Sequence, residues 1–236
     1  MGLVQLVVRT AAMLGMHVSR LSKQPVTTVM GHIYRPIDLI LDIGANEGQF
    51  AHEMRTKFPH AHIISVEPLP GPFAVLEAWA KADGNATALN LALGEAEAIL
   101  RINVHLDHST SSSLLATHEE GLGTFPEMTR QHSIETPVRR LDDVLAETGR
   151  AVGINTLLKL DVQGFEEKVL RGAPETLGRV GALLTEVCID PLYEGQAEFF
   201  TLCRIAQDAG LHYAGNYSQY CAQDGHVIFL DAFFTR

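Results

Sequence analysis

The chain has 236 residues, of which 46% are apolar and 19% charged, with a formal net charge of −10 at pH 7. This length accommodates one α/β domain with a complete core but not two full-sized domains. An acidic surface repels phosphates, so we expect no nucleic-acid partner, whereas a neutral small molecule meets no such barrier.

The N-terminus predicts a helical extension. Residues 1–20 are apolar with Arg9 in the middle, and they lack both an early positive cluster and a long uninterrupted apolar core. This pattern fits neither a signal peptide nor a membrane span. An amphipathic helix remains, and packing on the domain or on a partner subunit is favoured over a membrane surface. We assign residues 1–36 to this extension and its linker, through which the chain could form a homodimer, and residues 37–236 to the domain.

The next segment predicts a strand, a turn, a helix and a second strand. Leu39–Ile43 is an apolar run that leads into Gly44-Ala45-Asn46-Glu47-Gly48. Apolar residues then recur at helical spacing to about Lys57. A second apolar run, His62–Val66, ends on the carboxylate Glu67.

Strands and helices continue to alternate along the rest of the chain. Residues 106–136 show weak periodicity and much Ser, Thr, His and Gly, so we expect a lid or substrate loop there. The remaining predicted helices cover 73–80, 141–147, 166–170 and 198–209, and the strands cover 86–93, 99–105, 156–160, 182–187, 212–215 and 227–234. Such alternation predicts an α/β fold with a doubly wound, mostly parallel sheet.

The glycine turn and Glu67 together predict a nucleoside site. Gly44 can adopt backbone angles closed to other residues, and Gly48 removes a Cβ from the start of the helix. Glu67 follows Gly48 by 19 positions, close to the offset at which nucleotide-binding folds place an acid that holds the ribose. The turn is not G-x-G-x-x-G, and Glu47 puts a carboxylate where a pyrophosphate would lie. A cationic, phosphate-free nucleoside therefore fits better.

The three cysteines, Cys188, Cys203 and Cys221, are far apart and show no C-x-x-C spacing. They indicate neither a zinc site nor a disulfide framework. A reducing cytoplasm is the simpler interpretation, so we expect a cytoplasmic location.

The glycine turn resembles the first motif of class I S-adenosylmethionine-dependent methyltransferases, and later segments resemble their FkbM-type family. These segments are 158–166, 169–173, Ser111-Ser112-Ser113-Leu114, Arg140-Leu141-Asp142-Asp143 and Leu192-Tyr193-Glu194-Gly195-Gln196. The resemblance covers the chain from about residue 39 to the C-terminus and implies a Rossmann-like sheet whose last strand is antiparallel. It also implies S-adenosyl-L-methionine as the cofactor. Gln163 departs from the family, which usually has Glu before the glycine.

The predicted cofactor site gathers at strand ends. Glu67 is expected to hold the ribose, or else to cap the following helix. Asp42 is expected to orient the turn or to reach the methionine ammonium through water, or else to satisfy local N–H groups. The strand end near residues 90–94 is where the resemblance places adenine. The complete predicted set is Asp42, Gly44, Ala45, Asn46, Gly48, Glu67, Asn90, Ala92 and Leu93.

Catalysis is assigned to a carboxylate and a histidine. Asp161 could orient or deprotonate a substrate hydroxyl, or cap the next helix. His108 is the first choice for a base among the histidines of residues 106–136. For the substrate, Ser111 and Ser112 offer a polar run, and Tyr193 belongs to the family motif.

A metal is not part of the predicted site. Asp161, Glu186 and Asp190 carry the oxygen ligands that Mg²⁺ prefers. The neutral Gln163 weakens that alternative, so Mg²⁺ is possible but not expected.

The sequence thus predicts an O-methyltransferase that acts on a hydroxyl of a sugar, glycolipid, glycoside or polyketide-like small molecule. A nicotinamide-dependent oxidoreductase would share Glu67, but it needs a phosphate-binding glycine triplet that is absent. A non-catalytic homologue that keeps the cofactor is the other alternative, with Gln163 as its main support.

Overall fold

The core of the protein is a seven-stranded sheet in the order β3-β2-β1-β7-β8-β10-β9. The computed structural model describes residues 3–14, 36–107 and 109–236. The strands are β1 (Leu39–Ile43), β2 (His62–Val66), β3 (Ala86–Leu89), β7 (Thr156–Leu160), β8 (Ala182–Cys188), β9 (His212–Cys221) and β10 (Val227–Thr235). Strands β3, β2, β1, β7 and β8 are parallel, and β10 is antiparallel to both β8 and β9. This confirms the predicted doubly wound sheet with an antiparallel last strand.

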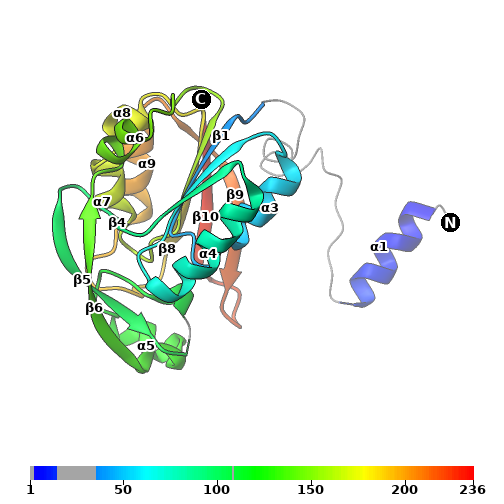
Figure 1. Cartoon of the computed structure of the whole chain (residues 1–236). Helices are drawn as coiled ribbons and strands as arrows, with labels where there is room; N and C mark the ends of the chain where they lie inside the picture. The colour runs from blue at the N-terminus through cyan, green and yellow to red at the C-terminus, as the bar shows by residue number, and fades with distance from the viewer. Residues whose placement is uncertain (1–2, 15–35, 108) are drawn as a thin grey trace.

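Alternating side chains of β1 face two different cores. Leu39 and Leu41 belong to one cluster, which contains residues of α6 (Leu141–Thr148), α7 (Glu166–Arg171), α8 (Pro174–Leu177) and α9 (Phe199–Asp208). Ile40 belongs to the other, with Met54 of α3 (Gln49–Lys57) and Trp79 of α4 (Pro70–Asp83). Figure 1 shows these two groups of helices on opposite sides of the sheet. Burial on both faces explains why most residues of the central strands are apolar.

Strand order reverses between β2-β1 and β7-β8. Because β1 lies between β2 and β7, the loops that follow β1 and β7 leave the sheet toward opposite sides and open a crevice. Ligands of open α/β sheets bind in such crevices, outside the carboxyl ends of the strands. The topology therefore places the candidate site after β1, β2 and β7.

A second, three-stranded sheet in the order β4-β6-β5 lies beside the first (Figure 1). It contains β4 (Ala92–Leu93), β5 (Ala98–His105) and β6 (Gln131–Arg139). The prediction of one strand over 86–93 was therefore wrong, because the chain changes sheets at Asn90 and Leu91. The Asn90 amide fixes this break by donating to the carbonyls of Glu67 and Pro68.

The region expected to be a loop, 106–136, is largely structured. It contains the 3₁₀ turns η2 (Ser109–Ser111) and η3 (Pro126–Thr129), the helix α5 (Glu119–Thr124) and the first part of β6. β6 was missed because most of its side chains are exposed, so no apolar alternation marks it. Backbone pairing with β5 holds it instead. β9 extends well beyond the predicted 212–215 for the same reason.

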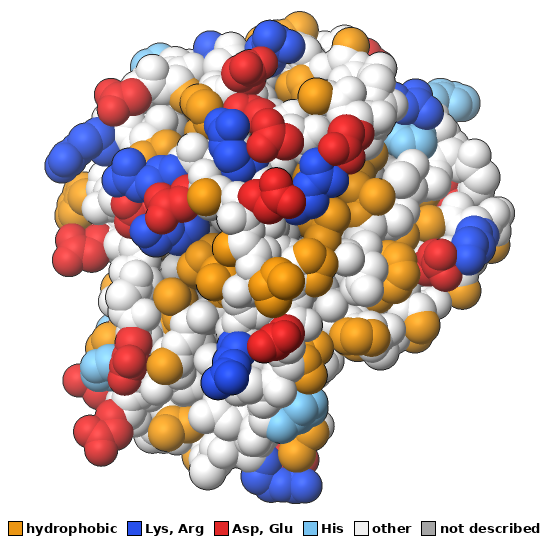
Figure 2. Space-filling model, turned by 60° about the vertical axis from the view of Figure 1, so that its left-hand side comes forward, with side chains coloured by type: hydrophobic (Ala, Val, Ile, Leu, Met, Phe, Trp, Pro, Cys, Tyr) orange, Lys and Arg blue, Asp and Glu red, His pale blue; other side chains and the backbone are white. Residues whose placement is uncertain are grey.

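The surface over α6, α7 and α8 mixes both signs of charge. Figure 2 shows acidic and basic side chains interspersed on the upper part of this face. Lys168 lies 2.8 Å from Glu95, and Arg171 lies 2.6 Å from Glu167. Exposed pairs of this kind contribute little to stability, so the core packing carries the fold.

The N-terminal extension begins with helix α1 (Leu3–Met13), which lies apart from the sheets in Figure 1. The part of the predicted extension at 15–35 falls outside the described residues. In the described part of the chain, no helix combines the length and apolar character needed to cross a membrane.

Candidate active site

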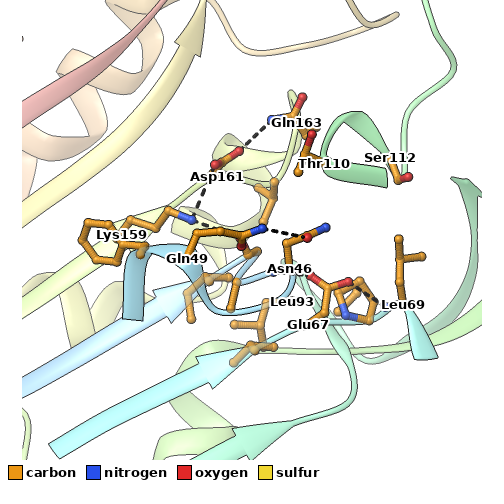
Figure 3. A pocket seen from close by; sticks show the side chains of 18 of the residues that line it. Asn46, Gln49, Glu67, Leu69, Leu93, Thr110, Ser112, Lys159, Asp161 and Gln163 are labelled. Atoms are coloured by element: carbon orange, nitrogen blue, oxygen red, sulfur yellow. Dashed lines mark hydrogen bonds and ion pairs between the residues drawn. The ribbon is translucent and has the colours of Figure 1, made fainter. Parts of the chain in front are cut away.

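A pocket of about 410 Å³ lies at the carboxyl ends of β1, β2 and β7. Figure 3 shows side chains from these strands and from the segment around Thr110 and Ser112 converging on it. Six of the residues predicted to bind the cofactor line this pocket: Gly44, Ala45, Asn46, Glu67, Ala92 and Leu93.

The turn after β1 is held by the strands beneath it. The N–H groups of Gly44 and Ala45 both donate to the carbonyl of Val66, at 3.0 Å each. Gly44 has φ +75°, and a Cβ there would lie 1.7 Å from the Asp161 carbonyl oxygen. Glycine is therefore required because β7 ends against this turn.

Gly48 and Asn90, both predicted to contact the cofactor, are not among the residues that line the pocket. Gly48 has φ +92°, and its missing Cβ faces Leu76 and His52 rather than a ligand space. The Asn90 amide instead donates to the backbone carbonyls of Glu67 and Pro68. Both shape the site from outside it.

Glu67 is buried at the edge of the pocket, with 4% of its surface exposed. Its two carboxylate oxygens accept from the N–H groups of Asn46 and Leu69, each at 2.8 Å. Burial raises the pKa of Glu67 to about 7, although the two backbone donors oppose the rise. Each oxygen keeps a second lone pair, so the carboxylate is fixed in place and still able to accept from two ligand hydroxyls.

The floor next to Glu67 is apolar. Leu91, Ala92, Leu93 and Ile102 line the pocket there, and Ala92 and Leu93 are buried. A flat apolar ring system could pack on these side chains, as the adenine prediction requires.

Lys159 is a site residue that the sequence analysis did not assign. Its ammonium lies 3.0 Å from the Gly44 carbonyl, 3.3 Å from Asp42 Oδ1 and 3.5 Å from Asp161 Oδ2. Burial opposes the charge, but the Asp161 and Asp42 carboxylates outweigh it and raise the pKa of Lys159. A lone lysine in an apolar strand was the available signal. Its partners were not visible, because they come from β1 and from the end of β7.

Asp42 lies beneath the pocket rather than in its lining. It is fully buried, and it faces Ser65 and Lys159 across the parallel register. Burial raises the pKa of Asp42, and the Lys159 ammonium opposes that rise. The geometry supports the interpretation in which Asp42 orients the turn, here through Lys159.

Asp161 is held from two sides at the pocket edge. Lys159 approaches one carboxylate oxygen, and the Gln163 amide donates to the other at 2.6 Å (Figure 3). The same amide nitrogen donates to Glu186 Oε2 at 2.7 Å. Gln163 therefore joins two carboxyl groups through its two N–H bonds.

The family motifs converge on the turn that carries Gln163. Gln163 has φ +55° and Gly164 has φ +92°. Ser113 Oγ donates to the Gln163 carbonyl at 2.6 Å. Buried Glu166 accepts from the N–H groups of Val162 and Gly164. Segments far apart in the sequence thus fix one strained turn.

The predicted substrate residues divide between two hollows. Ser112 lines the pocket just described, while Ser111 and Tyr193 line a neighbouring one. Tyr193 is 2% exposed, and its hydroxyl lies 2.6 Å from Gln163 Oε1 and 2.9 Å from the Ser111 carbonyl. Tyr193 thereby positions Gln163. His108 lies outside the described residues.

The three carboxylates considered for Mg²⁺ do not form one cluster. The Gln163 amide lies between Asp161 and Glu186, and Asp190 accepts from His226 Nε2 at 3.0 Å. The described part of the chain contains no group of three or more His, Cys, Asp or Glu arranged to hold a metal ion.

The sheet order, the antiparallel last strand and the pocket after β1, β2 and β7 define the fold of a class I methyltransferase. The family model described as the methyltransferase FkbM domain matches residues 42–213. The chain therefore belongs to the FkbM methyltransferase family, as its motifs predicted.

Relatives agree with this assignment, and a solved structure shares the fold. The chain is 33% identical to 31-O-demethyl-FK506 methyltransferase FkbM of Streptomyces tacrolimicus, over 60% of this chain and 61% of that protein. It is 30% identical to 2-O-methyltransferase NoeI of Sinorhizobium fredii, over 71% of this chain and 70% of that protein. The crystal structure of methyltransferase FkbM from Methylobacillus flagellatus matches at a TM-score of 0.55 and 12% identity. That match covers 86% of this chain but 44% of the solved one.

Proposed function

We propose that this protein is an S-adenosylmethionine-dependent O-methyltransferase acting on a hydroxyl of a sugar, glycolipid, glycoside or polyketide-like small molecule. The observation that carries the proposal is the position of Asp161, a carboxylate held by Lys159 and Gln163 at the edge of the pocket. The relatives named as a 2-O-methyltransferase and a 31-O-demethyl-FK506 methyltransferase support oxygen as the acceptor atom.

The pocket residues fit the proposed cofactor. Glu67 has acceptor capacity for both ribose hydroxyls, and Ala92 and Leu93 offer an apolar surface to adenine. The turn at 44–46 lines the same pocket, and we assign the amino-acid part of the cofactor to it. The cofactor supplies a methyl group on sulfonium sulfur. When bound, it would donate this methyl group to the acceptor oxygen, and the electron pair of the broken carbon–sulfur bond would stay on sulfur.

The protein's part in transfer is alignment and proton removal. Asp161 accepts the hydrogen bond of the acceptor hydroxyl and takes its proton as the oxygen reacts. Lys159 and Gln163 restrict the carboxylate to one orientation, and alignment of this kind provides much of the acceleration in displacement reactions.

The two alternative functions have less support. The chain lacks the glycine triplet with which a nicotinamide-dependent oxidoreductase binds the pyrophosphate of its cofactor. The non-catalytic interpretation depended on Gln163, but this residue makes three close hydrogen bonds that order Asp161 and Glu186. Its neutral amide is consistent with a working site.

Asp161→Asn tests the proposal. The variant should bind S-adenosylhomocysteine as the parent does, since Asp161 is assigned to the acceptor, while methyl transfer falls about a hundredfold or more because the proton acceptor is lost. Calorimetry measures binding, and labelled methyl transfer to a panel of hydroxylated acceptors measures turnover. Asp143→Asn, on the exposed face of α6, is the control. Turnover of Asp161→Asn within a factor of two of the parent would show that Asp161 is not the base.

A further inference from the structure

A second hollow of about 430 Å³ adjoins the first, and three residues line both: Thr110, Asp161 and Gln163. Molecules bound in the two hollows would therefore meet at Asp161. Since the first hollow fits the cofactor, the second is the space from which an acceptor can reach the same carboxylate.

Three aromatic side chains form one wall of this second hollow. Phe125 precedes η3, Tyr220 lies on β9 and Phe229 on β10. The Tyr220 and Phe229 rings stack with centroids 5.2 Å apart, and Phe125 lies 5.9 Å from Tyr220. Tyr220 is 49% exposed, so a ligand could cover a substantial part of its ring. Such a wall favours a ligand with an apolar face.

The polar residues that line this hollow carry carboxyl, hydroxyl and amide groups. Asp161, Glu186 and Glu127 line the hollow, and among its described lining residues there is no Lys or Arg. An anionic acceptor would therefore meet carboxyl groups, with no basic side chain in the lining of the hollow. The Gln163 amide holds Asp161 and Glu186 within 2.7 Å of one nitrogen, which places two carboxyl groups in reach of neighbouring hydroxyls on one ring.

A cationic acceptor is also disfavoured. Burial, together with the nearby Asp161 and Glu166 carboxylates, raises the pKa of Glu186 well above its ordinary value. This shift favours the neutral carboxyl of Glu186, and a neutral carboxyl can both donate to and accept from hydroxyls. Lys159 adds a positive charge 3.5 Å from Asp161.

We propose that the second hollow is the acceptor site and that it binds an uncharged ring bearing neighbouring hydroxyls, of the pyranoside type, with its apolar face against the aromatic wall. The proposal narrows the acceptor class of the function proposed above and rests on it for the reaction, but binding to the hollow can be measured separately.

Saturation-transfer NMR on the full chain with S-adenosylhomocysteine present tests the proposal. The probes are methyl glucopyranoside, the matching glucuronide anion and the matching 2-amino cation, which share one ring and differ in charge. We expect transfer to the neutral glycoside and little to the other two. Absence of transfer to the neutral glycoside, or equal transfer to all three, would overturn the proposal.

Variants of Tyr220 test whether the glycoside binds in the second hollow. Tyr220→Ala should weaken glycoside binding roughly two- to tenfold, the range expected for loss of one aromatic contact, whereas Tyr220→Phe keeps the ring and most of the affinity. Tyr213→Ala is the matched control, since Tyr213 lies on the same strand with 44% exposure and lines neither hollow. An unchanged affinity in Tyr220→Ala would overturn the proposed location.

The function proposed above and the acceptor site proposed here can fail independently of each other. If calorimetry detects no S-adenosylhomocysteine binding while the neutral glycoside still binds at Tyr220, the methyltransferase proposal is wrong and the carbohydrate site remains. If the nucleoside binds and the neutral glycoside does not, the acceptor class is wrong and the cofactor site remains.

Discussion

In the free protein, hydrogen bonds to the Glu67 carboxylate favour its ionised form, while burial favours its protonated form. Its backbone hydrogen bonds hold it ready for a ligand, and its burial favours the protonated form, with a pKa of about 7. The folded chain binds this proton more tightly than the unfolded chain does, so the stability contributed by Glu67 declines as the pH rises from 4.5 to about 7. Ligand binding has the opposite dependence, because ribose hydroxyls donate to the ionised carboxylate.

We predict that affinity for S-adenosylhomocysteine increases about tenfold between pH 6 and pH 8, since the free protein must lose the Glu67 proton first. Glu67→Gln should bind more weakly at pH 8, and its affinity should vary much less with pH. Calorimetry at pH 6, 7 and 8 provides the measurement. An equally steep pH dependence in the variant would assign the titration to another group.

Gln163 shows how a neutral residue can order two acids. Its side chain contacts Asp161, Glu186 and Tyr193, and its own backbone has a positive φ of 55°. A positive φ is costly for residues other than glycine. The surrounding contacts therefore compensate for this strain at a point where two pockets meet.

We predict that Gln163→Met, which keeps the side-chain length and removes the amide, lowers turnover about tenfold. Asp161 then loses the hydrogen bond that orders it, and one buried hydrogen bond is worth about 1–3 kcal/mol. The pH profile of turnover should also move to higher pH, since Glu186 loses a hydrogen bond to its ionised form and its pKa rises further. Affinity for S-adenosylhomocysteine should stay unchanged. A variant that matches the parent in turnover and pH profile would contradict this role.

At the scale of elements, the turn between β1 and α3 is shaped by the strand beside it. The end of β7 approaches so closely that only a glycine fits at position 44. Gly84, at the end of α4, has almost the same φ, +74°, but no atom lies within 4 Å of its missing Cβ. Substitutions at the two positions can therefore be compared to separate the cost of backbone strain from the cost of a steric clash.

We predict that Gly84→Ala lowers the free energy of unfolding by about 1 kcal/mol, the cost of a left-handed conformation, and leaves S-adenosylhomocysteine binding intact. Gly44→Ala should cost several times more and abolish binding, because the clash with the Asp161 carbonyl displaces both the turn and the acid. Urea unfolding and calorimetry measure the two effects. Equal losses in both variants would show that β7 does not constrain the turn.

At the scale of the whole molecule, the described hydrophobic clusters draw their members from residue 37 onward. Helix α1 contributes to none of these clusters. It exposes apolar side chains instead: Val4, Leu6, Val7 and Val8 are 40–70% exposed. An exposed apolar stripe on a helix favours association with another surface.

We predict that residues 36–236 fold alone, bind S-adenosylhomocysteine as the full chain does, and unfold with a free energy within about 0.5 kcal/mol of it. The full chain should be a dimer and the shortened chain a monomer, since α1 is the proposed contact. Light scattering and urea unfolding provide the measurements. A shortened chain that is unfolded, or that still dimerises, would contradict this division.

The sequence by itself determined the central strands, their helices and the main ligand-binding turn. Burial on both faces makes β1, β2, β7 and β8 predominantly apolar, and a turn that needs positive φ calls for glycine. These constraints are local, so they can be seen in short segments. Glu67 was found for the same reason, because a crossover of nearly constant length separates it from the turn.

Only the tertiary structure decided which polar groups meet. The Lys159 ammonium contacts Asp42 and Asp161 because β1 and β7 are adjacent in the sheet, and the sequence does not show that adjacency directly. Likewise, the sequence alone indicated only that Gln163 replaces a charged residue. The structure shows that its amide donates to Glu186 of the neighbouring strand β8 at 2.7 Å. Strands β6 and β9 also stayed hidden, because backbone pairing holds them and leaves no apolar pattern. Long-range pairing is a property of the packed chain, so the chemistry of the site depends on the fold.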